Sequence, residues 1–457
     1  MRICLLLPLL LLPQDKATRT SDTVRTSDLA FIIDEIAREA DRAVERPNDR
    51  VLVTWLIDNS TSLKSLRQGE LLSGHIARAF AKQKTGVHHS VLSFAEQPQV
   101  ILKATADPRA AGRAIEWLAA QKPDDTIKNC CANIRAGAAY AGGFTGGKRF
   151  LVVFTGPNGD NEDRVEETLK LLRDAGVVLH VIADEAVYSD PYWEALLSSG
   201  SGYYGDANRF KKLKFEMKGP DSAYIEFPHG WILTSGDPTY TVPSGFGFWA
   251  LNRMTAWTGG RYFLYSPAES SQSFCERWQC TVCSGKHKAC GAAFDSIKLK
   301  ITAPSIDSRD LVRERLARDK LTVATYAVWE KLYRWGIVHN SSALRASGGG
   351  LTETKPQVGT VLPLGFMSNW KQGRETCKRL VADLDKLIAE FGEAVERLGP
   401  EAEKRALATA DALQAHMKIM RFNLWQLRAF CEDLEEHERK KHGAEGGGFG
   451  SDGLDDT

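Results

Sequence analysis

The sequence predicts an α/β protein with a doubly wound, mostly parallel β-sheet, and three observations lead to this fold class. Strand-like and helix-like segments alternate between residues 51 and 183. The first strand, 51–57, is apolar except for Thr54, as expected of a strand buried on both faces. After an interruption, a helix at 246–258, a Gly-Gly stop and a strand at 261–265 resume the pattern. Such alternation is typical of a parallel sheet covered by helices on both faces.

The expected elements follow from hydrophobic periodicity. Helices are predicted at 28–46, 62–84, 108–120, 127–140 and 162–175. Further strands are predicted at 89–95, 100–105, 150–155 and 177–183. The stretch 187–245 is rich in Gly, Pro, Ser and aromatic residues, and we interpret it as an insertion into the α/β domain.

The remaining chain is divided by composition. We expect a Cys-rich and helical extension at 267–340, a Ser/Gly/Thr-rich linker at 341–367, a helical hairpin at 368–440 and a disordered tail at 441–457. In both hairpin helices apolar residues recur at steps of four and three, which favours antiparallel packing. Packing within one chain explains these stripes, and a homodimer through the C-terminal helices is the alternative.

The net charge and the N-terminus bear on partners and location. A formal net charge of +1 over 457 residues gives no reason to expect nucleic acid as a partner. Arg2 and the Leu-rich run 3–12 are typical of a signal peptide, so we expect 1–27 to be a signal peptide and polar leader. The protein is then exported, to a periplasmic, cell-envelope or extracellular location, and its mature chain is expected to have no stable membrane span.

The cysteines fit an exported protein. Once Cys4 leaves with the signal peptide, eight of the nine cysteines remain, an even number that suits disulfides. One cluster comprises Cys275, Cys280, Cys283 and Cys290. Two disulfides are expected there, and a Zn²⁺ site is the alternative if the chain stays in a reducing compartment. Cys130 and Cys131 are adjacent in a predicted helix and are expected to be buried thiols that do not pair with each other.

A polar motif follows the first buried strand. Asp58-Asn59-Ser60-Thr61-Ser62 opens the next predicted helix. Loops at the carboxyl ends of parallel strands meet in a crevice, where Asp58 offers a carboxylate and Ser60 and Ser62 offer hydroxyls. Such hard oxygens suit Mg²⁺. The alternative is that the two serines only cap the helix and fill its first turn.

This D-x-S-x-S pattern resembles the metal-ion-dependent adhesion site (MIDAS) of the von Willebrand factor A (VWA) family. Thr126 sits where the family places a metal-site threonine, 151–155 resembles the family strand that ends in Thr-Asp-Gly, and 257–263 resembles its last helix-to-strand turn. The resemblance covers about residues 50–266. It implies a Rossmann-like sheet in a VWA domain over 28–266 and a non-enzymatic protein-binding role, as in large exported bacterial VWA proteins.

The chain departs from the family pattern at one ligand. Gly156-Pro157 replaces the second metal-site aspartate, and Asp160 or Asp163 of the same loop is expected to substitute for it, giving a weak Mg²⁺ site. The alternative is a VWA scaffold that has lost its metal site and recognises its ligand through the insertion. Aromatic residues of the insertion and the following helix are expected to flank this site and contact a protein ligand, because aromatics are enriched in binding hot spots. They are Tyr203, Tyr204, Trp231, Tyr240 and Trp249. The alternative is that they form the insertion's own core.

Catalytic motifs do not favour an enzyme. The sequence contains neither the H-E-x-x-H pattern of metalloproteases nor the G-x-S-x-G pattern of α/β-hydrolases. The segment Gly142–Lys148 resembles a phosphate-binding loop, but Arg149 replaces its Ser/Thr and the segment precedes a strand. We therefore expect a protein-binding function. The alternatives are a metal-independent structural or assembly component of the cell envelope, and a hydrolase without these motifs.

Overall fold

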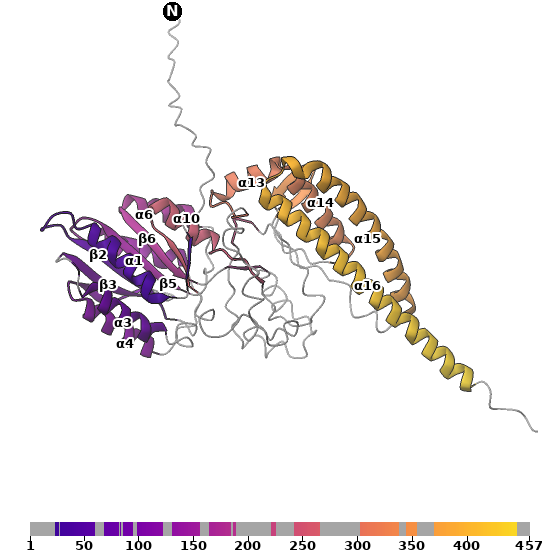
Figure 1. The fold of residues 1–457 in the computed structure, drawn as a ribbon, viewed down its shortest axis with the longest axis horizontal. Coiled ribbons are helices and arrows are strands. Elements are labelled where there is room, and N and C mark those ends of the chain that lie inside the picture. Colours follow the sequence, from indigo (N-terminus) through magenta and orange to yellow (C-terminus); the bar gives the residue numbers. More distant parts are fainter. Residues whose placement is uncertain are drawn as a thin grey trace, which may run out of the picture.

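The structure, a computed structural model, describes most of the predicted elements. It describes residues 23–26, 28–59, 68–81, 83, 86–94, 98–121, 130–155, 164–183, 186–188, 221–224, 242–265, 302–337, 344–353 and 370–445. In Figure 1 the α/β part lies on one side, and the C-terminal helices, orange to yellow, lie on the other.

The predicted α/β fold is confirmed. Seven strands form one sheet in the order β1-β9-β6-β5-β2-β3-β4, and all neighbours are parallel except β3 and β4. The strands are β1 (Thr23–Thr26), β2 (Val51–Asp58), β3 (Val87–Phe94), β4 (Gln99–Thr105), β5 (Arg149–Thr155), β6 (Val177–Ala183) and β9 (Tyr262–Tyr265). The sheet is therefore mostly parallel, with its antiparallel strand at one edge.

Helices cover both faces of the sheet, as a doubly wound fold requires. One layer contains α1 (Leu29–Arg42), α3 (Gln68–Phe80) and α4 (Pro108–Ala120), and the other contains α5 (Cys130–Gly142), α6 (Val165–Asp174) and α10 (Trp249–Thr258). Strand β2 shows the division: Val53 and Trp55 pack with the first layer, whereas Leu56 packs with the second. All of β2 is buried, which explains its apolar sequence.

The N-terminal boundary of the domain differs from the prediction. Thr23–Thr26, assigned above to the leader at 1–27, forms β1 and pairs in parallel with β9 at the edge of the sheet. Two threonines and a valine favour a strand, but so short and polar a segment gives no periodic signal. The α/β domain therefore begins by residue 23, and any signal-peptide cleavage that preserves β1 must occur before that residue.

The predicted insertion has its two ends held together. Strand β7 (Val187–Tyr188) pairs antiparallel with β8 (Val242–Pro243). Beside this short ladder the Ala186 N–H donates to the Phe246 carbonyl at 2.8 Å, and the Ser244 N–H donates to the Ala186 carbonyl at 2.9 Å. The chain thus leaves and re-enters the domain at one point, next to the end of β6.

The predicted linker at 341–367 is wrong for part of its length. Strands β10 (Leu344–Ser347) and β11 (Gly350–Glu353) form an antiparallel hairpin. Gly348 and Gly349 join them with φ angles of 59° and 84°, which glycine adopts without steric cost and a two-residue hairpin turn requires. Leu344 and Leu351 are buried against the α/β core. The glycines mark a tight turn, where composition alone indicated a flexible linker.

The C-terminal helical hairpin is confirmed. Helix α13 (Arg309–Arg318) leads into α14 (Lys320–Arg334), which packs against both α15 (Trp370–Leu398) and α16 (Lys404–Glu445). A single 3-10 turn, η7 (Gly399–Glu401), separates α15 from α16. Helix α16 runs to Glu445, so the predicted disordered tail does not begin at 441. Among the described residues no helix is both long enough and apolar enough to cross a membrane.

The heptad-like stripes are used within the chain. Their buried members are Cys377, Leu380, Leu384, Leu387 and Phe391 on α15, and Leu413, Met417, Met420, Leu424 and Cys431 on α16. All of these residues except Cys431 share one core with Trp329 and Leu332 of α14. Packing within one chain therefore explains most of the apolar stripes that the sequence shows in these two helices.

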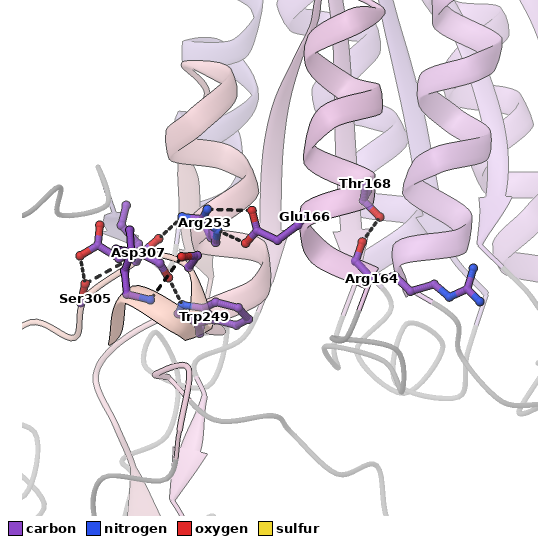
Figure 2. Close-up of polar contacts among 10 residues, drawn as sticks. Arg164, Glu166, Thr168, Trp249, Arg253, Ser305 and Asp307 are labelled. Atoms are coloured by element: carbon purple, nitrogen blue, oxygen red, sulfur yellow. Dashed lines mark hydrogen bonds and ion pairs between the residues drawn. The ribbon is translucent and has the colours of Figure 1, made fainter. Parts of the chain in front are cut away.

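A buried arginine ties the α/β domain to the segment that leads into α13 (Figure 2). Arg253 of α10 is 5% exposed and donates from Nε and Nη2 to the two carboxylate oxygens of Glu166, at 2.6 and 2.8 Å. Its Nη1 donates to the Ile306 carbonyl at 2.8 Å. The Trp249 indole N–H donates to the Asp307 carbonyl at 3.2 Å. One guanidinium thus joins α6, α10 and the 305–308 segment.

We expect Arg253→Ala to destabilise the protein by about 2–3 kcal/mol, because it leaves a buried carbonyl and a carboxylate without their charged donor. The matched control is Arg164→Ala at the N-terminus of α6, two residues before Glu166. The Arg164 side chain is exposed, so we expect the free energy of unfolding to change by less than about 0.5 kcal/mol. Urea unfolding followed by circular dichroism measures both. Equal midpoints for the two variants would contradict the role assigned to Arg253.

Three buried histidines predict a loss of stability in mild acid. Burial lowers the pKa of His180 to about 3, and that of His89 and of His416 to about 4, from 6.5. Above pH 6.5 these groups are neutral in both states; below it the unfolded chain takes up protons that the folded chain does not. Each histidine therefore lowers the unfolding free energy by up to about 1.4 kcal/mol per pH unit as the pH falls toward 4.

The measurement is the slope of unfolding free energy against pH between 6.5 and 4.5 for the wild type, His180→Gln and the exposed control His437→Gln. We expect a shallower slope only for His180→Gln. An unchanged slope in that variant would show that His180 is not the group responsible.

Candidate functional site

The candidate site lies where the order of the strands reverses. Starting from β2, the chain places β3 and β4 on one side and β5, β6 and β9 on the other, so β2 and β5 form the switch point of the sheet. Open α/β sheets bind ligands outside the carboxyl ends of the strands at such a point. Asp58 is the last residue of β2, and Thr155 is the last residue of β5. The topology thus brings these two side chains to one place.

Asp58 and Thr155 contact each other directly. The Thr155 hydroxyl donates to Oδ2 of Asp58 at 3.0 Å. Asp58 is 2% exposed and Thr155 is 4% exposed, so the Asp58 side chain is buried at the carboxyl edge of the sheet. Burying a carboxylate is costly unless donors or cations compensate it. The threonine hydroxyl supplies one such donor and fixes one oxygen of the carboxylate.

The chain that leaves β2 is held toward β3. The Asn59 N–H donates to the carbonyl of Phe94, the last residue of β3, at 3.4 Å, and Asn59 is buried. At the same end of β3 the Ser93 hydroxyl accepts from the Gln99 N–H at 3.2 Å. Three strand ends therefore surround Asp58, those of β5, β2 and β3.

These groups fit a hard divalent cation in their chemistry. A carboxylate and hydroxyls are oxygen donors, and Mg²⁺ is bound in proteins by one or two carboxylates together with several waters. The other predicted ligands, Ser60, Ser62, Thr126 and Asp160, lie outside the described residues, as does Gly156. Among the described residues no group of three His, Cys, Asp or Glu side chains forms a metal cluster. The described part of the site therefore offers one carboxylate.

Sequence reasoning missed the role of Thr155. It was noted only as the end of a strand, whereas the structure makes it the hydrogen-bond partner of Asp58. The signal was its position: the last residue of the strand next to β2 at the switch point. Position in the strand order, and not the local motif, identifies it.

The expected role of Trp249 is wrong. Its side chain is 1% exposed in the core between α10 and the sheet, and its indole bonds to Asp307, so it is unavailable to a partner (Figure 2). It begins α10 in a run in which nearly every residue is buried, which explains why an aromatic residue stands there. The other four predicted contact residues, Tyr203, Tyr204, Trp231 and Tyr240, lie outside the described residues.

The cysteine predictions divide in the same way. Cys130 and Cys131, the first residues of α5, are buried as expected. The cluster of Cys275, Cys280, Cys283 and Cys290 lies outside the described residues. The choice between disulfides and zinc therefore stays a prediction.

Comparisons with known proteins do not assign the chain to a family. No family model and no curated protein matches the sequence. An aerotolerance-related membrane protein from Bacteroides fragilis, with multiple mutations to serines, is 16% identical at a TM-score of 0.29, and the match covers 49% of this chain and 94% of that one. Proximal thread matrix protein 1 from the mussel byssus is 17% identical at a TM-score of 0.24, covering 30% and 36% respectively. At these TM-scores neither likeness carries an argument.

The Asp58–Thr155 contact predicts an energetic coupling. We expect Thr155→Val to cost about 1–3 kcal/mol, because the buried carboxylate loses a donor, and Thr155→Ser to cost less because it keeps the hydroxyl. In a double-mutant cycle with Asp58→Ala, which removes the carboxylate that accepts from Thr155, the coupling energy should exceed about 0.5 kcal/mol. Urea unfolding in the presence of a chelator measures all four proteins. Strictly additive effects would contradict the contact.

Proposed function

We propose that the protein is an exported, non-enzymatic binding protein of the VWA type that recognises a protein ligand through a weak Mg²⁺-assisted site at Asp58. One observation carries the proposal: Asp58 and Thr155 are hydrogen-bonded at the carboxyl ends of β2 and β5, at the switch point of a mostly parallel sheet. The D-x-S-x-S pattern that starts at Asp58 supports it.

The proposed site holds its ion with few charges. Asp58 is the fixed carboxylate, and Ser60, Ser62 and Thr126 add hydroxyls, with Asp160 as a second carboxylate from the loop after β5. Thr155 positions Asp58 by holding Oδ2. Because Gly156 stands where the VWA pattern has an aspartate, we expect weaker binding than in a site with both carboxylates. The bound ion would supply a positive centre that an acidic side chain of the ligand coordinates.

The insertion is proposed to add the specific contacts. It begins just after β6 and is closed at its base by β7 and β8. Parallel strands β2, β5 and β6 end at the same edge of the sheet, so the insertion leaves the domain on the side where Asp58 lies. Tyr203, Tyr204, Trp231 and Tyr240 would then contact the ligand, since aromatic side chains contribute large contact areas at interfaces. Trp249 is excluded from this set by its burial.

Export is part of the proposal. Arg2 with the Leu-rich run 3–12 supports it. A non-enzymatic binding role is supported by the D-x-S-x-S pattern that starts at Asp58. The competing explanation is a metal-independent structural component of the cell envelope. The two differ in whether Asp58 binds a divalent cation.

The test is calorimetric titration with Mn²⁺. We expect wild type to bind weakly, Asp58→Asn to lose binding while its volume and the contact with Thr155 are retained, and Gly156→Asp to bind about tenfold more tightly because it restores a carboxylate. The matched control is Asp34→Asn, which removes an exposed carboxylate from α1 and should bind as the wild type does.

Circular dichroism and thermal unfolding establish that each variant is folded. Equal binding by wild type and Asp58→Asn would exclude Asp58 as a ligand. If neither wild type nor Gly156→Asp binds, the protein is better described as a metal-independent scaffold, with recognition through the insertion.

A further inference from the structure

Helix α16 carries apolar side chains on the face opposite its buried stripe. Phe422 is 55% exposed, Trp425 is 56% exposed, Phe430 is 45% exposed and Ile419 is 39% exposed. Single exposed hydrophobic residues are common on protein surfaces and need no explanation. Several large apolar side chains clustered on the outside of one helix, in contrast, are typical of a binding surface. The intramolecular core of α14, α15 and α16 uses the other side of the helix.

Two of these residues, Phe422 and Trp425, belong to a continuous stripe with heptad-like spacing, and Ile419 and Phe430 lie to one side of it. The stripe, called the outer stripe below, consists of Asp411, Ala415, Lys418, Phe422, Trp425, Ala429, Asp433, Glu436 and Lys440. All are exposed except Ala429, which is half-buried. Steps of four and three residues keep side chains on one face of a helix over several turns, which is the pattern of helix-on-helix packing.

The charges of the outer stripe are complementary to those of an antiparallel second copy. If two stripes cross antiparallel about a point between Trp425 and Gln426, Lys418 faces Asp433 of the second copy, and Asp411 faces Lys440. In the same register Phe422 faces Ala429, so a large residue meets a small one. The two Trp425 side chains lie side by side at the centre. In this register each charged residue of the outer stripe faces either a residue of opposite charge or a neutral residue of the second copy.

We propose that the outer stripe of α16 is a self-association surface, on which a second copy of this chain docks antiparallel with Trp425 at the two-fold axis. A two-fold interface must be self-complementary, and this register satisfies that condition in both charge and size. A lipid surface does not explain the stripe, because Asp411, Asp433 and Glu436 would be placed against the headgroups. Desolvated aromatics at the centre and charges toward the ends form the arrangement typical of protein interfaces.

The size of the surface sets the expected strength. Residues 411–440 span about 45 Å of helix. With a contact strip about 10 Å wide, the dimer would bury on the order of 900 Å² in total, below the roughly 1,200 Å² of stable specific interfaces. We therefore expect a reversible dimer with a dissociation constant in the micromolar range. Such a dimer would present two α/β domains together and raise the avidity for a repetitive ligand.

The first experiment measures the mass of the full chain by sedimentation velocity at concentrations from about 1 to about 100 µM. Wild type should shift from monomer to dimer, and Trp425→Glu should stay monomeric, with dimerisation weakened by at least about tenfold. The matched control is Trp117→Glu, since Trp117 on α4 is 54% exposed, almost as much as Trp425. This control should dimerise like the wild type.

A charge exchange tests the register itself. Lys418→Asp and Asp433→Lys should each weaken the dimer about tenfold, because each creates two like-charged pairs across the axis, and the double variant should restore it. This pair is preferred to Asp411 and Lys440, because Lys440 already forms an ion pair with Glu436 at 2.7 Å. Circular dichroism checks the helix content of each variant.

Three outcomes would overturn the proposal. The wild type could remain monomeric at about 100 µM, Trp425→Glu could dimerise as well as the wild type, or the double charge variant could fail to recover. Binding of monomeric wild type to vesicles of phosphatidylglycerol, lost in Trp425→Glu, would reassign the stripe to a lipid surface and likewise refute a dimer.

Discussion

The burial of β2 on both faces is the constraint on which the rest of the structure depends. All eight residues of the strand are buried, so apolar side chains alternate into two helical layers, and its backbone groups are satisfied by β3 and β5. Inside the strand the one polar side chain, Thr54, accepts a hydrogen bond from the Ser90 hydroxyl at 2.9 Å, and a charged side chain has room only where the strand ends. Asp58 stands at that end, and the strand order makes the end a switch point. Fold and candidate site thus follow from one requirement.

A carboxylate placed so deeply needs compensation, and the neighbouring strand supplies part of it. Thr155 ends β5 in register with the end of β2 and donates to Asp58. The same neighbourhood explains why a metal site here is proposed to be weak: Gly156 follows Thr155, so the strand end that orients Asp58 contributes a hydroxyl and no second charge. Arg253, paired with Glu166, joins the domain to the 305–308 segment on the face of the sheet that α6 and α10 cover. Asp58 takes no part in these hydrogen bonds.

Much of the fold could be predicted from the sequence because β2, β5 and β6 are strongly apolar and alternate with amphipathic helices. The edge strand β1 could not, since four polar and β-branched residues carry no periodicity, and its partner β9 lies far along the chain. The β10–β11 hairpin was missed because Gly348-Gly349 is compatible with both a flexible linker and a tight turn. The burial of Leu344 and Leu351 distinguishes the two, and that burial is visible only in the folded structure. Asp58 was predictable from its motif, but its contact with Thr155 depends on strand order, and the burial of Trp249 depends on packing.

The most direct measurement is a crystal structure of the protein soaked in Mn²⁺, with anomalous diffraction used to locate the ion. The proposed function predicts an anomalous peak at the carboxyl ends of β2 and β5, about 2.1 Å from a carboxylate oxygen of Asp58. A structure in which this edge is ordered but carries no peak, or in which the ion binds elsewhere and Asp58 contacts only protein groups, would contradict it.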